Sequence, residues 1–468
     1  MPRAEVIGLG RSGIAAAKVL NQDGWDVTLG DAATKDSILS RSNGQELQKS
    51  IQELEQENIA VKLAYSPNLT ENKPDLIVVS PGVPWDIPIL VAAREQGIDT
   101  IGEIELAWRY LSEIPWLGVT GTNGKTTTTA LLAAMFKAAG LSAPACGNIG
   151  YAACELVLQQ NQPGNNLDWV VAELSSYQIE ASAQLQPRIG LWTTFTPDHL
   201  SRHKTLEHYY QIKASLLDRS RQAIFNGDDP YLRKLGQTQW QNAYWTTIGD
   251  KDSLFGDREI KRDRLVWIED SWIVAFGELI LPLSLFKMPG KHNQQNLLLA
   301  VAAARLAGID KNAIAEAITS FPGVPHRLEY LGTYQGVDYI NDSKATNYDA
   351  AEVGLASVDA PAILIAGGQA KSGEDQAWIE QIKQKASSVL LIGEAAEYFA
   401  QRLRESDYSN YEIVETLENA VVRSAELAQE NNAKVVLLSP ACASFDQYLS
   451  FEHRGDRFRE LCQLRNED

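Results

Sequence analysis

The sequence predicts an α/β protein with three domains built on mainly parallel sheets. Short apolar segments of strand length alternate with longer helical patterns along most of the chain, an order typical of βαβ units. Polar and glycine-rich clusters follow the ends of the apolar segments, at the edge where open parallel sheets bind ligands. A chain of 468 residues exceeds what one hydrophobic core normally serves, and this length favours about three domains.

Composition describes a globular protein and restricts its partners. Hydrophobic residues make up 44% of the chain and charged residues 22%, which excludes a disordered protein. The net charge of −18 argues against a nucleic-acid partner, because phosphate backbones attract basic surfaces. No apolar run approaches the ~18 residues needed to span a bilayer, and residues 1–20 lack a signal-peptide pattern. We therefore expect a cytoplasmic protein with no membrane partner.

The four cysteines form no CxxC pair and no metal-binding spacing. We expect Cys146, Cys154, Cys442 and Cys462 to be reduced thiols that lie in the core or line a site, as in cytosolic proteins.

The segment Gly118–Thr129, GVTGTNGKTTTT, has the pattern of a phosphate-binding loop. It joins a strand-like run to a helical pattern, so backbone N–H groups and a helix N-terminus would hold anionic oxygens. Lys125 would reach the terminal phosphates, and Thr126 would offer its hydroxyl to Mg²⁺. The spacing is not the ordinary Walker one, because Val119 stands where that pattern has glycine. A turn that only caps a helix is the alternative, and GKT after a strand favours nucleotide binding over it.

Residues 1–103 predict a Rossmann-like first domain. A strand at Ala4–Leu9 leads into the turn Gly8–Gly13, GLGRSG, and Asp31 follows about 20 positions on. This order fits a nucleotide-binding βαβ unit, and it does not choose between a dinucleotide and the ribose and diphosphate of a UDP-sugar. A further strand, Leu76–Ser80, ends at the same ligand-binding edge.

Residues 104–322 contain most of the candidate chemistry. Glu173 ends a strand-like run beside the phosphate loop, where an acid can hold Mg²⁺ directly or through water. An exposed strand-end acid is the alternative. His199 follows the predicted strand Ile189–Thr196 at the same edge, and a structural histidine is its alternative. Lys213 lies in a helical pattern and, from composition alone, is a surface or amphipathic lysine.

Two further stretches belong to this central segment. Val266–Leu283 alternates in polarity and predicts an antiparallel hairpin that covers one side of the domain, with its tryptophans in the core. Polar residues crowd the helix start at Gly290–Asn296 and suggest a second nucleotide or phosphate contact, with helix capping as the alternative.

Residues 323–468 predict a second doubly wound parallel sheet. The predicted strands are Val337–Ile340, Ala362–Ala366, Val389–Ile392 and Val435–Leu438. Polar clusters at Asn341–Asn347 and Ser439–Asp446 follow strand ends, where this kind of sheet binds ligands.

Several motifs together resemble the Mur ligase family, the ATP-dependent amide ligases of peptidoglycan precursor synthesis. The motifs are GTNGKT (Gly121–Thr126), GNIG (Gly147–Gly150), ELSSYQ (Glu173–Gln178), Asp198-His199, His292 with Asn293 and Asn296, His326-Arg327, NDSKATN (Asn341–Asn347) and SPACASFDQ (Ser439–Gln447). The resemblance covers nearly the whole chain and is greatest for the ligases that add D-glutamate to UDP-N-acetylmuramoyl-L-alanine.

The resemblance implies three domains with separate tasks. Residues 1–103 would be a Rossmann-like domain that binds the UDP-substrate. Residues 104–322 would be a P-loop ATPase-like domain with a mostly parallel sheet and a small antiparallel part. Residues 323–468 would be a Rossmann-like domain that binds the amino acid. We expect a monomer that serves cell-wall biogenesis, and through it cell shape and cell division.

The implied reaction begins when ATP phosphorylates the substrate carboxylate to an acyl phosphate. The amine of D-glutamate then attacks through a tetrahedral intermediate, and phosphate leaves. A carboxylate is a poor electrophile, and phosphorylation supplies the leaving group that it lacks. Negative charge gathers in both steps, and Mg²⁺ and lysine must offset it.

The resemblance also assigns residues to ATP, to two Mg²⁺ ions and to catalysis. The implied catalytic residues are Lys125, Glu173, His199, Lys213 and Lys344. The implied ATP-binding residues are Gly121, Thr122, Asn123, Gly124, Lys125, Thr126, Thr127, Asn293, Asn296, Arg327 and Asp342. The implied metal ligands are Thr126, Glu173, His199 and, if carbamylated, Lys213. Carbamylation needs an unprotonated amine and therefore a lowered pKa at Lys213.

The two substrates of the implied reaction match further residues. For the UDP-substrate they are Gly10, Arg11, Ser12, Asp31, Ser80, Gly82, Asn148 and His199. For D-glutamate they are Thr346, Lys371, Ser444 and Phe451. The acceptor loop departs from the usual DGKS or DGKT pattern, since Gln369 and Ala370 precede Lys371, and Ala32-Ala33 follow Asp31 where relatives often have polar residues.

Other functions remain as alternatives. Related ligases add L-alanine, a diamino acid or D-Ala-D-Ala, and folylpolyglutamate synthases lack a uridine-binding first domain. The diamino-acid ligases usually carry a DNPR motif, which is absent here. From another class, a nucleotide-dependent switch would need no acceptor pocket, and an NAD(P) dehydrogenase would explain GLGRSG but not the GKT loop.

Overall fold

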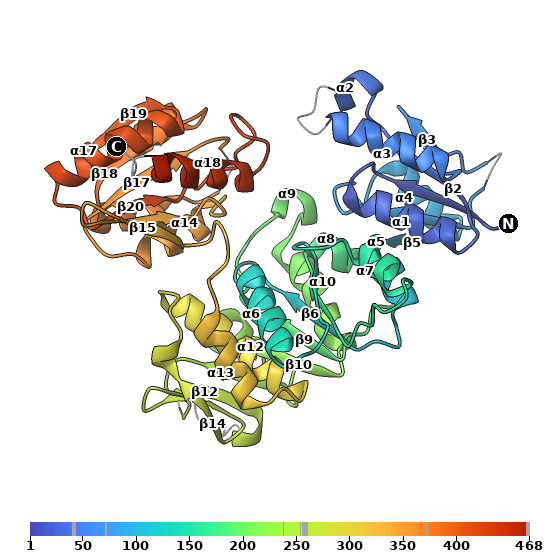
Figure 1. The fold of residues 1–468 in the computed structure, drawn as a ribbon, viewed down its shortest axis with the longest axis horizontal. Helices are drawn as coiled ribbons and strands as arrows, with labels where there is room; N and C mark the ends of the chain where they lie inside the picture. Colours follow the sequence, from blue (N-terminus) through green and yellow to red (C-terminus); the bar gives the residue numbers. More distant parts are fainter. Residues whose placement is uncertain are drawn as a thin grey trace. The chain divides into compact units, whose positions relative to one another are not determined.

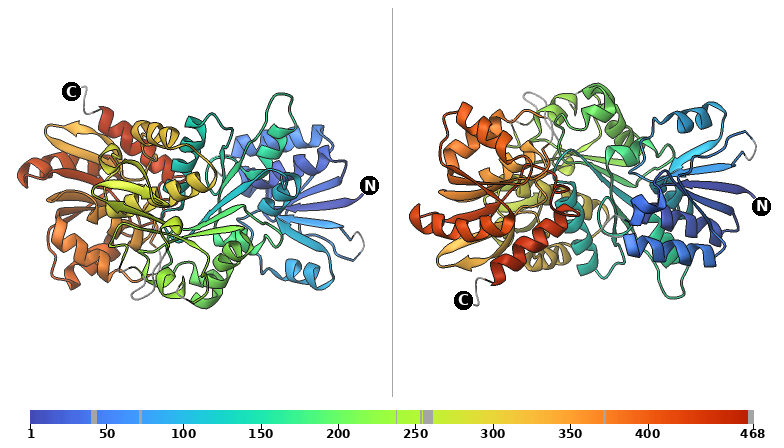
Figure 2. Two further views of the ribbon diagram at one scale, coloured as in Figure 1. Left: turned by 90° about the horizontal axis from the view of Figure 1, so that it is seen from below. Right: turned by 90° about the horizontal axis from the view of Figure 1, so that it is seen from above.

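The computed structural model describes residues 1–39, 44–70, 73–236, 238–252, 254, 261–370 and 373–464. The chain forms two compact units, one of residues 1–286 with 295–321 and one of residues 287–294 with 322–468. The first unit contains two sheets and the second contains one, and helices flank each sheet (Figures 1 and 2). The predicted α/β class with mostly parallel sheets is confirmed. The domain boundaries at residues 103 and 322 stay predictions.

The first sheet has five parallel strands in the order β3-β2-β1-β4-β5. Its elements are β1 (Arg3–Ile7), α1 (Arg11–Gln22), β2 (Asp26–Asp31), α2 (Lys35–Leu39), α3 (Gly44–Gln56), β3 (Ala60–Leu63), β4 (Leu76–Val79), α4 (Pro88–Glu95), β5 (Asp99–Gly102) and α5 (Glu103–Tyr110). Strand β4 is apolar and buried at every position, as a parallel strand covered on both faces requires. The strand order reverses between β1 and β4, which places the ligand-binding crevice at their carboxyl ends.

The second sheet has nine strands in the order β14-β13-β12-β11-β10-β9-β6-β8-β7. The strands are β6 (Trp116–Thr120), β7 (Ala145–Gly147), β8 (Val170–Glu173), β9 (Ile189–Trp192), β10 (Gln222–Asn226), β11 (Tyr244–Thr247), β12 (Leu265–Glu269), β13 (Trp272–Ala275) and β14 (Glu278–Pro282). The helices of this stretch and the residues after it are α6 (Lys125–Ala138), α7 (Ala153–Gln160), α8 (Ser176–Glu180), α9 (Leu200–His203), α10 (Leu206–Arg219), α11 (Pro230–Gly236), α12 (Lys291–Leu306) and α13 (Lys311–Ser320). Strands β6 to β12 pair in parallel, which places the phosphate loop after β6 beside the ends of β8 and β9.

The antiparallel pairing predicted at residues 266–283 is confirmed, but the prediction was wrong in two other respects. Three strands, β12, β13 and β14, extend the sheet at its edge instead of covering one side of it. The two turns between them each have two residues with positive φ, Asp270-Ser271 and Phe276-Gly277, a backbone that matches the twist of tight antiparallel turns. Trp267 is buried, but Trp272 is 38% exposed and does not belong to the core.

Strand β9 is shorter than predicted, because it ends at Trp192 and not at Thr196. The next residues leave the sheet to bind the phosphate loop. The carbonyl oxygen of Thr194 accepts a hydrogen bond from the backbone N–H of Thr122 at 2.9 Å, and the Thr194 hydroxyl accepts one from the N–H of Asn123 at 2.9 Å. Thr194 therefore holds the phosphate loop by hydrogen bonds and does not continue the pairing of β9 in the sheet.

The third sheet has the order β15-β16-β20-β17-β18-β19, parallel except for the edge pair β15–β16. Its elements are β15 (Glu329–Tyr334), β16 (Val337–Asn341), α14 (Tyr348–Ala356), β17 (Ala362–Gly367), α15 (Gln376–Lys385), β18 (Ala386–Ile392), α16 (Ala396–Glu405), β19 (Tyr411–Glu415), α17 (Leu417–Glu430), β20 (Val435–Leu438) and α18 (Phe451–Leu464). Because β16, β20 and β17 are neighbours, the polar clusters after them leave the sheet side by side.

All four cysteines are buried. Among the described residues, no helix is long and apolar enough to cross a membrane.

Candidate active site

The phosphate loop joins β6 to α6 through two glycines with left-handed backbone, Gly121 at φ +148° and Gly124 at φ +83°. A Cβ atom at Gly121 would collide with the hydroxyl of Thr193, and one at Gly124 would collide with the side-chain oxygen of Asn296. Glycine is required here both by the backbone conformation and by the close approach of these side chains. The departure from Walker spacing therefore still produces a tight loop before a helix N-terminus.

Lys125 lies over this loop. Its Nζ donates hydrogen bonds to the carbonyl oxygens of Gly121 at 2.9 Å and Thr122 at 2.8 Å. Thr126 and Thr127 follow in the first turn of α6, and both are buried. The loop thus gathers a cation, hydroxyls and a helix N-terminus in one place, which is an arrangement that attracts phosphate.

Glu173, the last residue of β8, is 1% exposed. Its Oε1 accepts a hydrogen bond from the Asn148 amide at 2.9 Å, and its buried Oε2 has no hydrogen-bond partner in the described part of the chain. Strand pairing aligns Glu173 with Val119 of β6, so the carboxylate is next to the phosphate loop. A buried acid with an unused oxygen at this position suits a divalent cation, and an exposed strand-end acid is ruled out.

Lys213 is buried, which corrects its assignment to the surface from composition. Its Nζ donates to the Gly121 carbonyl oxygen at 2.9 Å and to the Thr120 hydroxyl at 3.3 Å, and it lies 4.8 Å from the centre of the Tyr209 ring. Burial, followed by the charge of Lys125, lowers the pKa of Lys213 well below its usual value. The low-dielectric surroundings disfavour the ammonium form.

His199 precedes α9 with a left-handed backbone at φ +54°. Its Nδ1 lies 3.3 Å from the Tyr177 hydroxyl, and its Nε2 lies 3.4 Å from a carboxylate oxygen of Asp198. Tyr177 comes from α8, which starts three residues after Glu173. The imidazole is therefore positioned by two elements that follow β8 and β9, the strands on either side of β6.

The glycine-rich turn after β1 is braced by the polar residues predicted around it. Asp31 accepts hydrogen bonds from the backbone N–H groups of Leu9 at 2.7 Å and Ala33 at 2.8 Å, so its two oxygens hold the turn and the end of β2. The Ser80 hydroxyl, after β4, donates to the Gly8 carbonyl oxygen at 3.0 Å. Asp31 and Ser80 thus come together at the predicted crevice. A Cβ at Gly13 would collide with the Gly8 carbonyl oxygen, so this glycine permits α1 to pack closely on β1.

Gly10 and Ser12 flank Arg11 where α1 begins, and Gly82 follows Ser80 after β4. The Arg11 guanidinium forms a two-pronged ion pair with Glu155 of α7, at 2.8 and 2.7 Å, and donates to the Gly150 carbonyl oxygen at 2.7 Å. This ion pair raises the pKa of Arg11. Arg11 therefore ties the glycine-rich turn to the GNIG segment of the second sheet.

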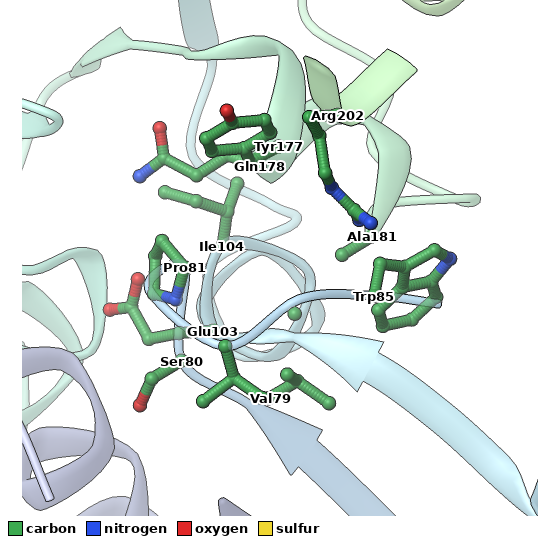
Figure 3. Close-up of a pocket in the computed structure, with 12 residues that line it drawn as sticks. Val79, Ser80, Pro81, Trp85, Glu103, Ile104, Tyr177, Gln178, Ala181 and Arg202 are labelled. Carbon is green, nitrogen blue, oxygen red and sulfur yellow. The ribbon is translucent and has the colours of Figure 1, made fainter. Parts of the chain in front are cut away.

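A pocket lies near this crevice, between the ends of β4 and β5 and the helices α5 and α8 (Figure 3). In the view of Figure 3, Ser80 and Glu103 lie on one side of it and Trp85 and Arg202 on the other. Glu103 is fully buried, and its Oε1 accepts from the backbone N–H of Cys154 at 2.6 Å. Burial raises the pKa of Glu103 to about 7. No sequence pattern marked Glu103 as a pocket residue, because a glutamate at a helix start is normally a solvated residue of the first turn.

Helix α12 carries two of the predicted nucleotide contacts. Within the first unit, Asn296 lies against Gly124, and its buried Nδ2 has no partner among the residues that the structure describes. Within the second unit, the Asn293 amide donates to the Pro289 carbonyl oxygen at 2.7 Å. Its Oδ1 is likewise buried without a partner in the described ranges. Unsatisfied buried amides are uncommon and indicate a ligand or water.

In the second unit, Asp342 follows β16 and is buried. It accepts from the Ser439 hydroxyl at 2.9 Å and from the backbone N–H of Leu328 at 3.2 Å. Burial raises its pKa to about 7, and the charge of Arg327 opposes this shift. Asp342 and Arg327 come from separate sequence motifs, and the structure brings them close enough for their charges to interact.

The predicted acceptor residues Thr346 and Ser444 lie in the loops after β16 and β20, and Phe451 begins α18. The Lys344 Nζ lies 5.2 Å from the centre of the Phe451 ring. The Thr346 N–H donates to the Lys344 carbonyl oxygen at 2.9 Å. The buried Ser444 hydroxyl has no hydrogen-bond partner within the described residues. Lys371 lies outside the described residues.

Arg454 of α18 was not among the candidate residues identified from the sequence. Its buried guanidinium donates to the Ser343 hydroxyl and carbonyl oxygen, both at 2.9 Å, and to the Cys442 carbonyl oxygen at 3.1 Å. It therefore joins the NDSKATN and SPACASFDQ loops. Burial lowers its pKa to about 10, and the carbonyl oxygens supply the hydrogen bonds that a buried cation needs.

Family models match three stretches of the chain. Residues 3–102 match the Mur ligase MurD-like N-terminal domain, residues 119–304 the Mur ligase middle domain, and residues 326–442 the Mur ligase glutamate ligase domain. The chain belongs to the Mur ligase family.

Curated relatives are similar to the chain over its whole length. A protein from Gloeothece citriformis is 67% identical over 463 residues, and one from Crocosphaera subtropica is 65% identical over 466 residues, each covering 99% of both chains. Both are named UDP-N-acetylmuramoylalanine--D-glutamate ligase.

Solved structures share the fold. A UDP-N-acetylmuramate-alanine ligase from Thermotoga maritima covers 99% of this chain and 100% of its own, with a TM-score of 0.59 and 18% identity. A pseudomurein peptide ligase type C from Methanothermus fervidus covers the same shares, with a TM-score of 0.56 and 19% identity.

Proposed function

We propose that this protein is an ATP-dependent amide ligase that adds D-glutamate to UDP-N-acetylmuramoyl-L-alanine in peptidoglycan precursor synthesis. One observation carries the proposal: 67% identity, over 99% of both chains, to a ligase with that name. The phosphate loop with Lys125, Lys213 and Glu173 around it supports the same chemistry. We further propose that the enzyme works in the cytoplasm as a monomer.

The phosphate loop would hold the nucleotide. Backbone N–H groups of residues 121–127 and Lys125 would bind the β- and γ-phosphates. In the transition state, Lys125 would turn from the loop carbonyl oxygens to the transferring phosphoryl group and offset its charge. Asn296, with its unsatisfied amide beside Gly124, would contact the nucleotide, and Asn293, Arg327 and Asp342 would serve the adenine and ribose side.

The residues beside the loop fit Mg²⁺, because Glu173 has an unused buried oxygen and Thr126 a hydroxyl. We propose two ions, one held by Thr126 and Glu173 and one by His199 and a carbamylated Lys213. The ions would supply positive charge for phosphoryl transfer to the substrate carboxylate. The lowered pKa of Lys213 supports carbamylation, since only the neutral amine attacks CO₂.

The two substrates would be held by the remaining predicted residues. Gly10, Arg11, Ser12, Asp31, Ser80, Gly82, Asn148 and His199 would bind or shape the site of the UDP-substrate. Thr346, Lys371, Ser444 and Phe451 would bind D-glutamate, with Lys344 near the attacking amine. The unsatisfied buried hydroxyl of Ser444 supports a polar ligand there.

Phosphate release tests this function directly. We expect release only when ATP, Mg²⁺, UDP-N-acetylmuramoyl-L-alanine and D-glutamate are all present, and a hydroxamate when hydroxylamine replaces the amino acid. A panel of amino acids, including L-alanine and a diamino acid, should show preference for D-glutamate. Release that needs no amino acid would favour a nucleotide-dependent switch, and preference for another amino acid would favour another ligase of the family.

A further inference from the structure

A cluster of two histidines and one glutamate lies outside the residues assigned above. Glu180 ends α8, His203 ends α9, and His208 lies in the first turn of α10. One potential ligand atom from each lies within 4.8 Å of the other two. His208 Nε2 and Glu180 Oε1 are the best-defined pair, at 3.8 Å.

His203 has a ring nitrogen available for a ligand. The residue is 1% exposed, and its Nε2 lies 2.9 Å from the Ser176 hydroxyl. Its Nδ1 is buried and has no hydrogen-bond partner in the described ranges of the chain. A metal-binding histidine typically has one nitrogen held by a hydrogen bond and the other on the ion. Burial, with help from Arg202, lowers the pKa of His203 to about 4, so the ring is neutral at pH 7 and can offer a lone pair.

Glu180 can serve a cation without losing its ion pair. Its Oε2 accepts from Arg202 at 3.0 Å, and Arg202 also pairs with Asp86. Oε1 is the oxygen that faces His208. The positive charge of Arg202 is therefore matched by two carboxylates, and one carboxylate oxygen is left for an ion.

The separations suit a small transition-metal ion after a modest adjustment. Tetrahedral ligands with bonds of about 2.0–2.1 Å lie about 3.4 Å apart. The 3.8 Å pair is already near this value, and the exposed His208 can move to close the remaining distance. Two imidazoles and one carboxylate, with a fourth position for water, form a donor set that prefers Zn²⁺ over Mg²⁺.

We propose that Glu180, His203 and His208 form a binding site for Zn²⁺ or a similar divalent transition-metal ion, separate from the Mg²⁺ ligands proposed at the phosphate loop. The site combines the ends of α8 and α9 with the start of α10. It lies beside the wall of the pocket in Figure 3, because Arg202 both lines that pocket and pairs with Glu180.

Metal titration of the full chain tests the proposal. The protein is freed of metal with a chelator and titrated with zinc chloride against a chromophoric chelator, and Co²⁺ absorption then reports a tetrahedral site. We expect one tight equivalent in the wild type. His208→Ala and Glu180→Gln should each weaken it by at least about 10-fold, with the circular dichroism spectrum unchanged.

Two more variants make the test specific. His453→Ala removes an exposed histidine elsewhere in the chain and should leave Zn²⁺ affinity unchanged. His199→Ala reports binding at the proposed Mg²⁺ site and should also retain the tight equivalent. Unchanged affinity in His208→Ala, loss of the ion in His199→Ala, or an equal loss in His453→Ala would each overturn the proposal.

Discussion

The side-chain nitrogen of Lys213 donates a hydrogen bond to the carbonyl oxygen of Gly121 across 2.9 Å. This bond links the middle of α10 to the first glycine of the phosphate loop. Burial at this position lowers the pKa of Lys213 below that of an exposed lysine. The geometry therefore places an amine with a lowered pKa against the loop that would hold the triphosphate.

A first prediction concerns carbon dioxide. Enzyme kept in CO₂-free buffer should lose activity, and bicarbonate should restore it, because the neutral amine of Lys213 would form a carbamate. Lys213→Ala should lose at least about 100-fold in kcat and should not respond to bicarbonate. Lys234→Ala, at an exposed position on α11, is the control and should respond as the wild type does. Equal activity with and without CO₂ in the wild type would rule out the carbamate.

A second prediction concerns the loop lysine. Lys125→Ala should lower kcat by more than about 100-fold, because it removes positive charge from the transferring phosphoryl group. Lys137→Ala, an exposed lysine in the last turn of the same helix, should keep wild-type turnover. The measurement is steady-state phosphate release at saturating substrates. A raised KM for ATP with an unchanged kcat would instead mean that Lys125 contributes only to ground-state binding.

A third prediction separates two roles of Arg11. Its ion pair with Glu155 is exposed, so Glu155→Gln should change the free energy of unfolding by less than about 1 kcal/mol. If Arg11 contacts the UDP-substrate, Arg11→Ala should raise the KM for that substrate about 10-fold, and Glu155→Gln should raise it much less. The same KM in both variants would show that Arg11 acts only by linking α1 to α7.

A fourth prediction follows from the raised pKa of Asp342. Its pKa of about 7 in the folded state exceeds the ordinary value of 3.8, so the folded state binds more protons between those pH values. Its contribution to stability is therefore greatest at low pH and falls as pH rises from about 4 to 7. Asp342→Asn removes this pH dependence. Between pH 5 and pH 8, the free energy of unfolding of the variant should therefore rise relative to that of the wild type by on the order of 2 kcal/mol.

Denaturant unfolding at both pH values measures that gain. Asp359→Asn, at an exposed position, is the control and should show no comparable change between the two pH values. The raised pKa would be contradicted if the wild type and Asp342→Asn differed in free energy of unfolding by the same amount at pH 5 and at pH 8.

A fifth prediction concerns the acceptor. Lys371→Ala should mainly raise the KM for D-glutamate, because a dianionic substrate would lose its cation. Ser444→Ala should have a smaller effect in the same direction, and Lys383→Ala on the exposed side of α15 should have none. Initial rates at varied D-glutamate concentration provide the measurement. Unchanged acceptor kinetics in Lys371→Ala would remove that residue from the pocket.

Sequence reasoning succeeded where the signal is local. The loop GTNGKT, the glycine-rich turn after β1 and the buried apolar strands are each encoded within a few neighbouring residues. The end of β9 and the three-stranded edge were misjudged, because hydrogen bonds that Thr194 accepts from the phosphate loop and two left-handed turns override the local polarity pattern. Lys213 was wrongly expected at the surface or on an amphipathic face, because a helical sequence pattern does not show which residues pack against the helix.

The sequence by itself determined the α/β class, the phosphate loop and the order of the polar clusters, because strand periodicity and glycine placement depend on short stretches of chain. Only the tertiary structure decided the lowered pKa of Lys213, the unused oxygen of Glu173 and the loops that Arg454 joins. Those properties depend on burial and on hydrogen-bond partners that lie from about ten to more than a hundred residues away in the chain, and it is folding that brings these groups out of water and into contact.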